Sequence, residues 1–509
     1  MPGSLARFKP PRQHMPWLDA LIEAFQSTPD APSEPVARLK DPWPGDAGRA
    51  EVLIQQEAEL MAALDPDPHD PELARDHVRR GRAQSFTWLR DLRSAGGDAA
   101  RRAARRGVTT WIETNRRSDP IGWRPDIVGQ RLSAWMGAYE FYAASAGPAF
   151  RAEVMEQTAV QVAWLRRRID LAPPGPGRFA ALAGLAAGAA AIGGSEAILT
   201  EVDRALVRAI RKELAPDGGL IGAAPLTQLD ALMRLLDLRA AFAAVGRPPP
   251  EASSDAASAM AAPLAALRFG DGGLGVFSGG EGDPWTIDLA LAASGWRGRA
   301  PLDLPQAGFA RAVAGRSTLL TCAGPGAFEF GHGGDRLVTS TGANSDAPPA
   351  RFEAPGISHF SAPCFAGGRM AAGAAVERDA DGGATLLTLA NTWSRPQAEW
   401  RRRLYLAADG HDLRGEDCAV GPAGQAMVVA FHLHPSADAI QLDDGGVLVR
   451  AHSGQGWRFR ADRPARLAAE PYRGRPGAAA AALRIEAPAA FDGEGKLLLR
   501  WAFRMERAI

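Results

Sequence analysis

The spacing of apolar residues changes near residue 266, and this change constrains the fold more than any other feature. Before it, apolar residues recur at helical spacing, as at Trp17, Leu21 and Phe25. After it, short runs alternate between polar and apolar residues, and Gly and Asp turns separate many of them. The sequence therefore predicts an α+β protein, with a helical region over residues 1–266 and an antiparallel β region over residues 267–509.

The helical region contains several amphipathic stretches separated by short Pro/Gly breaks. The predicted helices lie at about 72–94, 97–114, 126–145, 148–169, 178–192, 195–213, 226–244 and 252–266. Short loops between such helices favour antiparallel hairpins packed as a bundle, solenoid or toroid. No fixed-period repeat is visible, which disfavours a regular solenoid. The strand-like runs that follow are typical of stacked antiparallel sheets.

The charge balance excludes one broad class of function. Lys and Arg total 58 and Asp and Glu total 58, so general nucleic-acid binding is not expected. Arg dominates the cations, which is compatible with an acidic ligand. The three cysteines, Cys322, Cys364 and Cys418, form neither a disulfide framework nor a metal-binding spacing. The sequence predicts no cofactor and no metal site.

Neither a secretory signal nor a membrane span is predicted. The first 25 residues lack a continuous apolar stretch followed by a small-residue cleavage site. The longest small, apolar stretch, residues 179–193, is Ala/Gly-rich and too short to cross a bilayer.

Several short motifs, taken in order, resemble the heparinase II/III-like family of bacterial polysaccharide lyases. They are residues 41–46 (DPWPGD), 88–93 (WLRDLR), 122–125 (GWRP), 401–406 (RRRLYL), 413–417 (LRGED), 431–435 (FHLHP) and 453–459 (SGQGWRF). The resemblance runs from about residue 40 to residue 505 and spans the helix-to-strand switch. It implies an incomplete α/α toroid followed by a β-sandwich, an acidic polysaccharide as partner, and a location in the periplasm or cell envelope. Since no export signal is visible, a cytoplasmic location is the alternative.

The resemblance also implies a chemistry. Lyases of this kind cleave acidic polysaccharides by β-elimination, in which a base removes a proton beside a carboxylate and an acid protonates the leaving sugar. Arg, Asn or His neutralises the carboxylate, and Tyr and His usually transfer the protons.

Four stretches depart from the family pattern at chemically important positions. Leu220 follows the Asp217-Gly218-Gly219 turn where the family commonly has His, and Phe309 stands where the family has Tyr. The stretches 324–330 (GPGAFEF) and 392–396 (TWSRP) lack the family's His. Leu and Phe cannot transfer protons, so the resemblance favours a scaffold that has lost its catalytic groups. We expect the Asp217 turn to join two helices at the mouth of the groove between the two regions.

The remaining candidates in the helical region are two tyrosines and a few polar neighbours. Tyr139 and Tyr142 lie at helical spacing from Trp135, and Arg131 shares that face. Such an aromatic stripe is usually core, and the functional alternative is a platform for a sugar ring beside a carboxylate. Asn115 and Arg178, at helix ends, are the other candidate substrate-binding residues.

Histidine is absent between residues 78 and 331, so a His-based site depends on the β region. His332 and His359 lie in Gly-rich or irregular segments, where ligand contacts occur. They are the candidate catalytic histidines, although a surface-loop role is the more common one. His432 and His434 alternate with Phe431 and Leu433, which places the two imidazoles roughly 7 Å apart on one face of a strand. The favoured interpretation is a polar outer face, and the functional alternative is a metal site or a proton relay.

Two hypotheses follow, and the sequence leaves open whether the protein is an enzyme. The first is an active lyase that uses Tyr139 or Tyr142 with His332 or His359, and Arg131 or Arg178 for the substrate carboxylate. The second is a catalytically degenerate glycan-binding or envelope-associated protein on the same scaffold. Convergence of Tyr, His and Arg between the two regions favours the first, whereas a groove filled by Leu220 and Phe309 favours the second.

Overall fold

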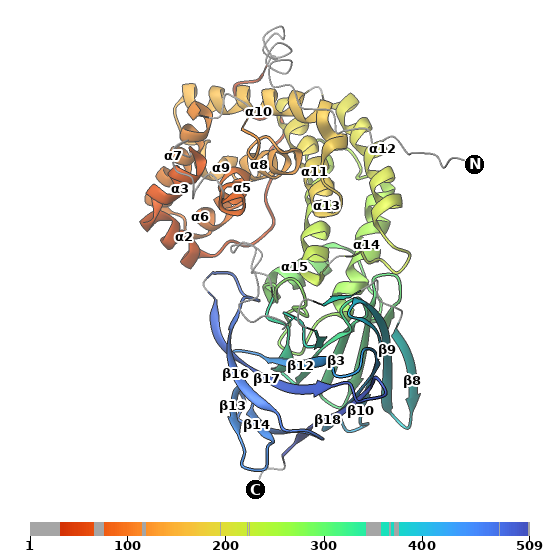
Figure 1. The fold of residues 1–509 in the computed structure, drawn as a ribbon. Helices are drawn as coiled ribbons and strands as arrows, with labels where there is room; N and C mark the ends of the chain where they lie inside the picture. Colours follow the sequence, from red (N-terminus) through yellow and green to blue (C-terminus); the bar gives the residue numbers. More distant parts are fainter. Residues whose placement is uncertain are drawn as a thin grey trace, which may run out of the picture.

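A helical layer lies against two stacked sheets in the computed structural model (Figure 1). The structure describes residues 31–65, 76–114, 119–193, 195–220, 222, 224–342, 358–365, 368–370, 376–477 and 479–506. The helices are α2 (Ala47–Gln55), α3 (Glu57–Leu64), α5 (His77–Ser85), α6 (Leu89–Ala95), α7 (Gly97–Thr114), α8 (Pro125–Gly137), α9 (Tyr139–Tyr142), α10 (Pro148–Arg168), the short 3₁₀ helix η1 (Ile169–Leu171), α11 (Pro176–Ile192), α12 (Glu196–Glu213), α13 (Pro225–Ala244), α14 (Glu251–Ala266) and α15 (Pro284–Ala293). The predicted order of helices followed by antiparallel sheets is confirmed.

One helix, α15, lies beyond the predicted switch of period. Asp283 caps it by accepting a hydrogen bond from the backbone N–H of Thr286, and Pro284 occupies its first turn. Ile287 and Ala290 of this helix are fully buried in the helical core. The boundary near residue 266 stays a prediction, and the helical layer continues past it.

Helix α11 forms the centre of the helical layer and explains the Ala/Gly-rich stretch. Its residues from Phe179 to Ala191 are all buried. A Cβ atom at Gly184 would clash with the backbone of Gly129 on α8, and a Cβ at Gly129 would clash with the backbone of α11. The small residues therefore let two helices approach backbone to backbone. Among the helices that the structure describes, none has the length and apolarity needed to traverse a bilayer.

Within the described residues, the strands form two antiparallel sheets of nine strands each. The first contains β1 (Asp303–Leu304), β2 (Phe309–Ala314), β3 (Ser317–Cys322), β4 (Ala327–His332), β5 (Asp335–Thr339), β12 (Ala426–Leu433), β17 (Ala480–Ala490) and β16 (Arg466–Tyr472) in that order, with β6 (Pro363–Cys364) beside β12. The second contains β13 (Asp438–Gln441), β14 (Val447–Arg450), β15 (Gly456–Ala461), β18 (Lys496–Met505), β11 (Asp412–Val420), β10 (Gln397–Leu406), β9 (Ala384–Arg395) and β7 (Arg369–Met370), with β8 (Val376–Asp381) beside β9.

The core between the sheets contains aromatic rings around one buried ion pair. Strand β10 alternates exposed and buried residues, so Arg402 points inward while its two neighbours point outward. Arg402 and Asp417 are both 0% exposed, and the arginine Nε lies 2.7 Å from Oδ1 of the carboxylate. The indole N–H groups of Trp400 and Trp501 also donate to Asp417. The buried charges are thus paired and hydrogen-bonded, as burial requires.

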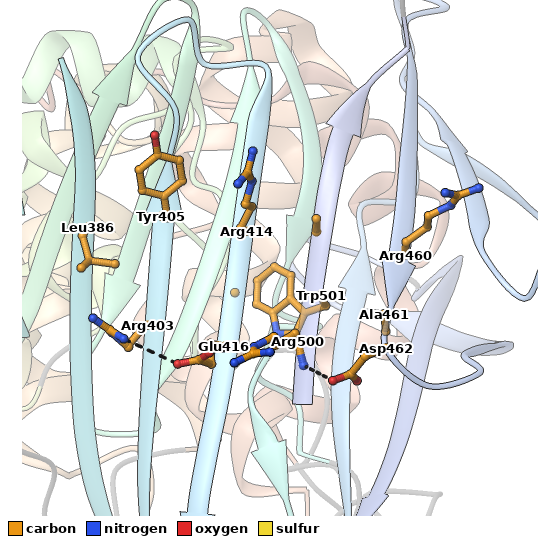
Figure 2. Close-up of a pocket in the computed structure, with 12 residues that line it drawn as sticks. Leu386, Arg403, Tyr405, Arg414, Glu416, Arg460, Ala461, Asp462, Arg500 and Trp501 are labelled. Carbon is orange, nitrogen blue, oxygen red and sulfur yellow. Dashed lines mark hydrogen bonds and ion pairs between the residues drawn. The ribbon is translucent and has the colours of Figure 1, made fainter. Parts of the chain in front are cut away.

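The outer face of the second sheet is rich in arginine. Arg403, Arg414, Arg460 and Arg500 surround a shallow groove of about 440 Å³ in which Tyr405 is also exposed (Figure 2). The neighbouring strands β9, β10, β11, β18 and β15 supply these residues and the groove floor.

Candidate functional site at the junction of the helical and β regions

The Asp217 turn touches the β region directly. It joins α12 to α13, and its carboxylate accepts hydrogen bonds from the backbone N–H groups of Gln306 (2.8 Å) and Ala307 (2.9 Å) between β1 and β2. Gly218 has a φ of +80°, and a Cβ there would clash with the backbone of Ala259 on α14. Glycine is therefore required at this position. The turn joins two helices and contacts the β region, as expected, and its position at the mouth of a groove stays a prediction.

The two apolar replacements fill space at this junction. Leu220 is 3% exposed and belongs to the helical core, and its backbone N–H donates to the side chain of Gln228 at 2.7 Å. Phe309 is 6% exposed, and its ring centroid lies 5.3 Å from that of Phe277 within a small apolar cluster. Neither side chain exchanges protons or binds a carboxylate.

The stretch that lacks the family's His before β4 is packed against the sandwich interior. The side-chain amide of Asn391 donates to the carbonyl oxygens of Ala323 (2.9 Å) and Gly324 (3.2 Å). Arg402 donates to the carbonyl oxygen of Gly326, where a Cβ would clash with the ring of Trp400. The backbone carbonyl oxygens of this stretch therefore accept hydrogen bonds from buried side chains of the sandwich.

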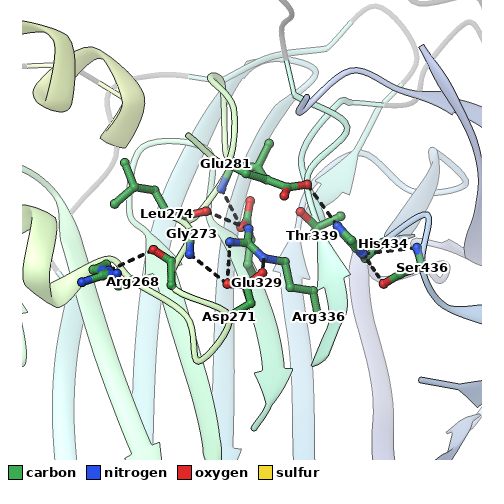
Figure 3. A network of polar contacts seen from close by, with 12 residues as sticks. Arg268, Asp271, Gly273, Leu274, Glu281, Glu329, Arg336, Thr339, His434 and Ser436 are labelled. Atoms are coloured by element: carbon green, nitrogen blue, oxygen red, sulfur yellow. Dashed lines mark hydrogen bonds and ion pairs between the residues drawn. The ribbon is translucent and has the colours of Figure 1, made fainter. Parts of the chain in front are cut away.

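A second polar group at the junction was not predicted, and we refer to Glu281, His434, Tyr472 and Arg475 as the Glu281 cluster. Figure 3 shows Glu281, from the loop between α14 and α15, pointing toward His434, which follows β12. His434 Nε2 lies 3.0 Å from Oε1 of Glu281, Arg475 Nε lies 3.1 Å from the same oxygen, and the Tyr472 hydroxyl also donates to it. The backbone N–H of Glu281 donates to the carbonyl of Gly474.

The proton positions in the Glu281 cluster follow from its contacts. The backbone N–H of Ser436 donates to Nδ1 of His434, which favours the neutral tautomer with its proton on Nε2 directed at Glu281, and Arg475 Nη2 lies farther from Nε2 at 3.3 Å. Burial lowers the pKa of His434, which favours this neutral form. Burial opposes ionisation of Glu281, but hydrogen bonds from His434 and Tyr472 and the charge of Arg336 outweigh it and lower its pKa to about 2.

These protonation states limit what the cluster can do chemically. Burial and the Glu281 carboxylate raise the pKa of Tyr472, so its hydroxyl stays protonated and donates. A tyrosine that acts as a general base must reach the phenolate form, which this arrangement disfavours. The Glu281 cluster is therefore better suited to linking the two regions than to removing a proton.

A second carboxylate extends the link (Figure 3). Glu329 on β4 is fully buried and accepts hydrogen bonds from the backbone N–H groups of Val276, Phe277 and Ser340. Arg336 on β5 pairs with Asp271 at 2.7 Å. Together these contacts fix the segment between α14 and α15 onto the first sheet.

The comparisons with known proteins agree with this architecture. The model of the family described as "Heparinase II/III-like, C-terminal" matches residues 297–497. FtsZ-localized protein C from Caulobacter vibrioides (strain NA1000 / CB15N) is 30% identical over 477 residues, which cover 84% of this chain and 82% of that protein.

The chain belongs to the heparinase II/III-like family. The crystal structure of Heparinase III is 12% identical in sequence, and the match covers 96% of this chain and 89% of the Heparinase III chain with a TM-score of 0.70. The structure of a heparan sulfate lyase from Pedobacter heparinus is 15% identical, and the match covers 90% of this chain and 83% of the lyase chain with a TM-score of 0.54. These likenesses confirm the predicted α/α toroid followed by a β-sandwich.

Within this heparinase II/III-like fold, the candidate tyrosines lie in the helical core. Tyr142 is fully buried and Tyr139 nearly so, and their ring centroids are 6.3 Å apart. Burial raises the pKa of both hydroxyls. Trp135 is fully buried and packs edge-on against Trp111. This placement agrees with the core interpretation of the aromatic stripe.

The candidate cations of the helical region are also engaged. Arg131 is 0% exposed, lies 4.1 Å from the ring centroid of Trp111, and donates to the Gln161 side chain. Burial lowers its pKa to about 9. Arg178 donates to the carbonyl of Ile169 at 2.9 Å. Asn115 lies outside the described residues.

The candidate histidines lie in the β region, far along the chain from the candidate tyrosines. His332 contacts Ser317 Oγ through Nδ1 at 2.9 Å and packs against Trp457. The carbonyl oxygen of His359 accepts a hydrogen bond from Thr341, and burial lowers the pKa of its ring to about 4. Ser317, Trp457 and Thr341 all belong to the β region, so these contacts bring neither histidine to a tyrosine of the helical core. The catalytic role of both histidines stays a prediction.

The interpretation of His432 and His434 as a polar outer face is wrong. His432, His434 and the two apolar residues that alternate with them are all buried. His432 Nδ1 lies 2.8 Å from the carboxylate of Glu470, whereas His434 contacts Glu281. Both faces of the sheet are covered at the end of β12. The alternation of polar and apolar residues therefore does not separate a buried face from an exposed one there.

Sequence reasoning missed Glu281, Tyr472 and Arg475. One signal was available, because the chain has only four tyrosines and Tyr472 is one of two outside the helical region. The other was the Gly-rich stretch around Glu281, since glycines often mark close backbone approach. Neither signal identifies a partner that lies 191 residues away along the chain.

Proposed function

We propose that this protein is a non-catalytic member of the heparinase II/III-like family that works by binding a protein partner. The observation that carries the proposal is the state of the junction. By the family resemblance, Leu220 stands where His is common and Phe309 stands where the family has Tyr, and both are buried in apolar clusters. Losing one proton-transfer group typically costs a factor of about 10² to 10⁴ in rate.

The partner that we propose is FtsZ. The relative at 30% identity bears the name FtsZ-localized protein C, and its similarity extends over 84% of this chain. That similarity therefore includes helical residues as well as the β-sandwich. The two lyase structures compared above are 12% and 15% identical, so they support the fold and leave the partner open.

A second candidate function is lyase activity on an acidic polysaccharide. The observation in its favour is that Tyr472, His434 and Arg475 converge on Glu281 at the junction. Binding of an acidic polysaccharide without cleavage, and a location in the periplasm or cell envelope, belong with this second candidate and rest on the family resemblance alone. The FtsZ proposal goes with the cytoplasmic alternative.

Binding of purified FtsZ to the immobilised full-length protein tests the first proposal. We expect saturable binding that Heparinase III, with the same fold at 12% identity, does not reproduce. A fluorescent fusion of this protein is expected to co-localise with FtsZ in the cell. Absence of both binding and co-localisation, together with turnover of an acidic polysaccharide, would overturn the proposal in favour of the second candidate.

A further inference from the structure

The groove on the outer face of the second sheet has an apolar floor. Leu386, Gly415, Ala461 and Ala502 contribute to it from β9, β11, β15 and β18. Leu386 is paired with Tyr405 across the sheet, and Ala502 is paired with Arg460, so shorter side chains alternate with longer ones. The longer side chains therefore form the rim of the groove, and the shorter ones form its bottom.

The rim of the groove is rich in arginine. Four arginines line it together with Glu416 and Asp462, and two of the arginines also pair with Asp412 and Asp444 beside the groove. Glu416 is shared, because Arg500 Nε lies 2.9 Å from it and Arg403 Nη1 lies 3.6 Å from it. The Glu416 pKa is lowered chiefly by its hydrogen bond with Arg500. One carboxylate thus serves two guanidinium groups.

The rim arginines can exchange their present partners for new ones. Their side chains are 52% to 65% exposed, and Arg414 and Arg460 pair with Asp412 and Asp444 at the surface. Exposed ion pairs contribute little to stability, so a ligand carboxylate can replace such a pair. Guanidinium groups bind carboxylates through two parallel hydrogen bonds.

One exposed aromatic ring stands among the arginines. Tyr405 is 37% exposed, and the guanidinium carbon of Arg414 lies 5.7 Å from its ring centroid (Figure 2). The ring and Leu386 together present an apolar surface beside the charges. Such a surface suits an apolar side chain that lies between two carboxylates.

We propose that this groove binds an acidic peptide segment of a protein partner, with an apolar side chain between its carboxylates. The proposal rests on the proposed function, because it locates the surface through which that partner is bound. The apolar surface of Leu386 and of the Tyr405 ring beside the arginines suits a ligand that carries an apolar side chain as well as carboxylates, as a peptide does. The groove is also hollow, whereas contact with a membrane requires protruding apolar side chains.

Fluorescence polarisation with a labelled peptide of alternating Glu and Leu residues tests the groove. The variants are Arg403→Glu with Arg460→Glu, and Tyr405→Ala. The matched control is Arg299→Glu, an exposed arginine between α15 and β1 that lies outside the groove. Heparin oligosaccharide and vesicles containing anionic lipid are tested in parallel. Circular dichroism verifies that each variant is folded.

We expect the double reversal to weaken peptide binding at least about tenfold, equivalent to about 1.4 kcal/mol, and Arg299→Glu to leave it unchanged. Added salt should weaken wild-type binding, since the contacts are exposed. Equal peptide affinity in the double variant and the wild type would overturn the inference, as would binding of heparin or vesicles alone. If FtsZ binds the wild type and the double variant equally, the groove is not the contact and the proposed function stands.

Discussion

Among the residues that the structure describes, one arginine in the helical region and one in the β region are 0% exposed, and they are buried in different ways. Arg402 in the sandwich has a carboxylate partner, Asp417, at 2.7 Å. Arg131 in the helical core donates to Gln161 and to the carbonyl oxygens of Gln84 and Gly122, and lies over Trp111. The first arrangement compensates the charge with another charge, and the second with neutral dipoles and a ring face.

This difference shows how to judge whether an arginine that a family resemblance picks out can bind a substrate. An arginine that binds a substrate carboxylate must reach the ligand, whereas both of these side chains are 0% exposed. In both regions the buried guanidinium group organises the core. On the outer face of the sandwich, by contrast, Arg403, Arg414, Arg460 and Arg500 are accessible.

The largest effect is expected at the paired arginine. Asp417→Ala leaves Arg402 buried without a counter-charge and should lower the free energy of unfolding by about 3–5 kcal/mol. Denaturant unfolding measures this loss. The control is Glu494→Ala, which removes an exposed pair with Lys496 and should cost no more than about 1 kcal/mol. Similar losses in the two variants would show that the buried pair is not special.

The contact between the two regions should show a specific pH dependence. The pKa of Glu281 is lowered to about 2, so its contribution is fully present above its ordinary pKa of 4.5 and is lost as the pH falls through 2. We expect Glu281→Gln to lose on the order of 2 kcal/mol of stability at neutral pH relative to the wild type.

Unfolding measured from pH 6 down to pH 2 checks this expectation. The wild-type advantage should shrink as the pH falls below about 4.5, because the unfolded state then binds the proton more readily. A constant difference between wild type and Glu281→Gln across this range would exclude an ionised Glu281 as the link between the regions.

A smaller effect is expected at the unpaired arginine. Arg131→Met removes a buried charge together with its hydrogen bonds and leaves the Gln161 oxygen unsatisfied, so we expect a loss of about 1–3 kcal/mol. Thermal and denaturant unfolding measure it. If Arg131 instead bound a substrate, the variant would keep its stability and lose affinity for an acidic glycan.

The sequence predicted the architecture because the period of apolar residues reflects which face is buried. The stretches predicted at 97–114, 148–169 and 195–213 correspond closely to α7, α10 and α12. Helix α15 was missed, although Asp283 and Pro284 provide its start signals, because Gly-rich turns surround it.

The site was less predictable because its contacts join residues that are distant in the sequence. Three arginines in a row at 401–403 do not indicate which one points inward until the strand register is known. The partners of Glu281 lie 153 to 194 residues away. The departures at Leu220 and Phe309 were visible, since they required only the residue types.

The most direct test of the central claim is an assay for β-elimination, which creates an unsaturated uronate with strong ultraviolet absorbance. The protein is incubated with heparan sulfate, hyaluronan or alginate, and the heparan sulfate lyase from Pedobacter heparinus on heparan sulfate serves as the positive control. We predict absorbance no higher than that of a protein-free control on every substrate. Growing absorbance that is abolished by Tyr472→Phe, His434→Ala or Tyr139→Phe in a folded variant would contradict the account and establish an active lyase.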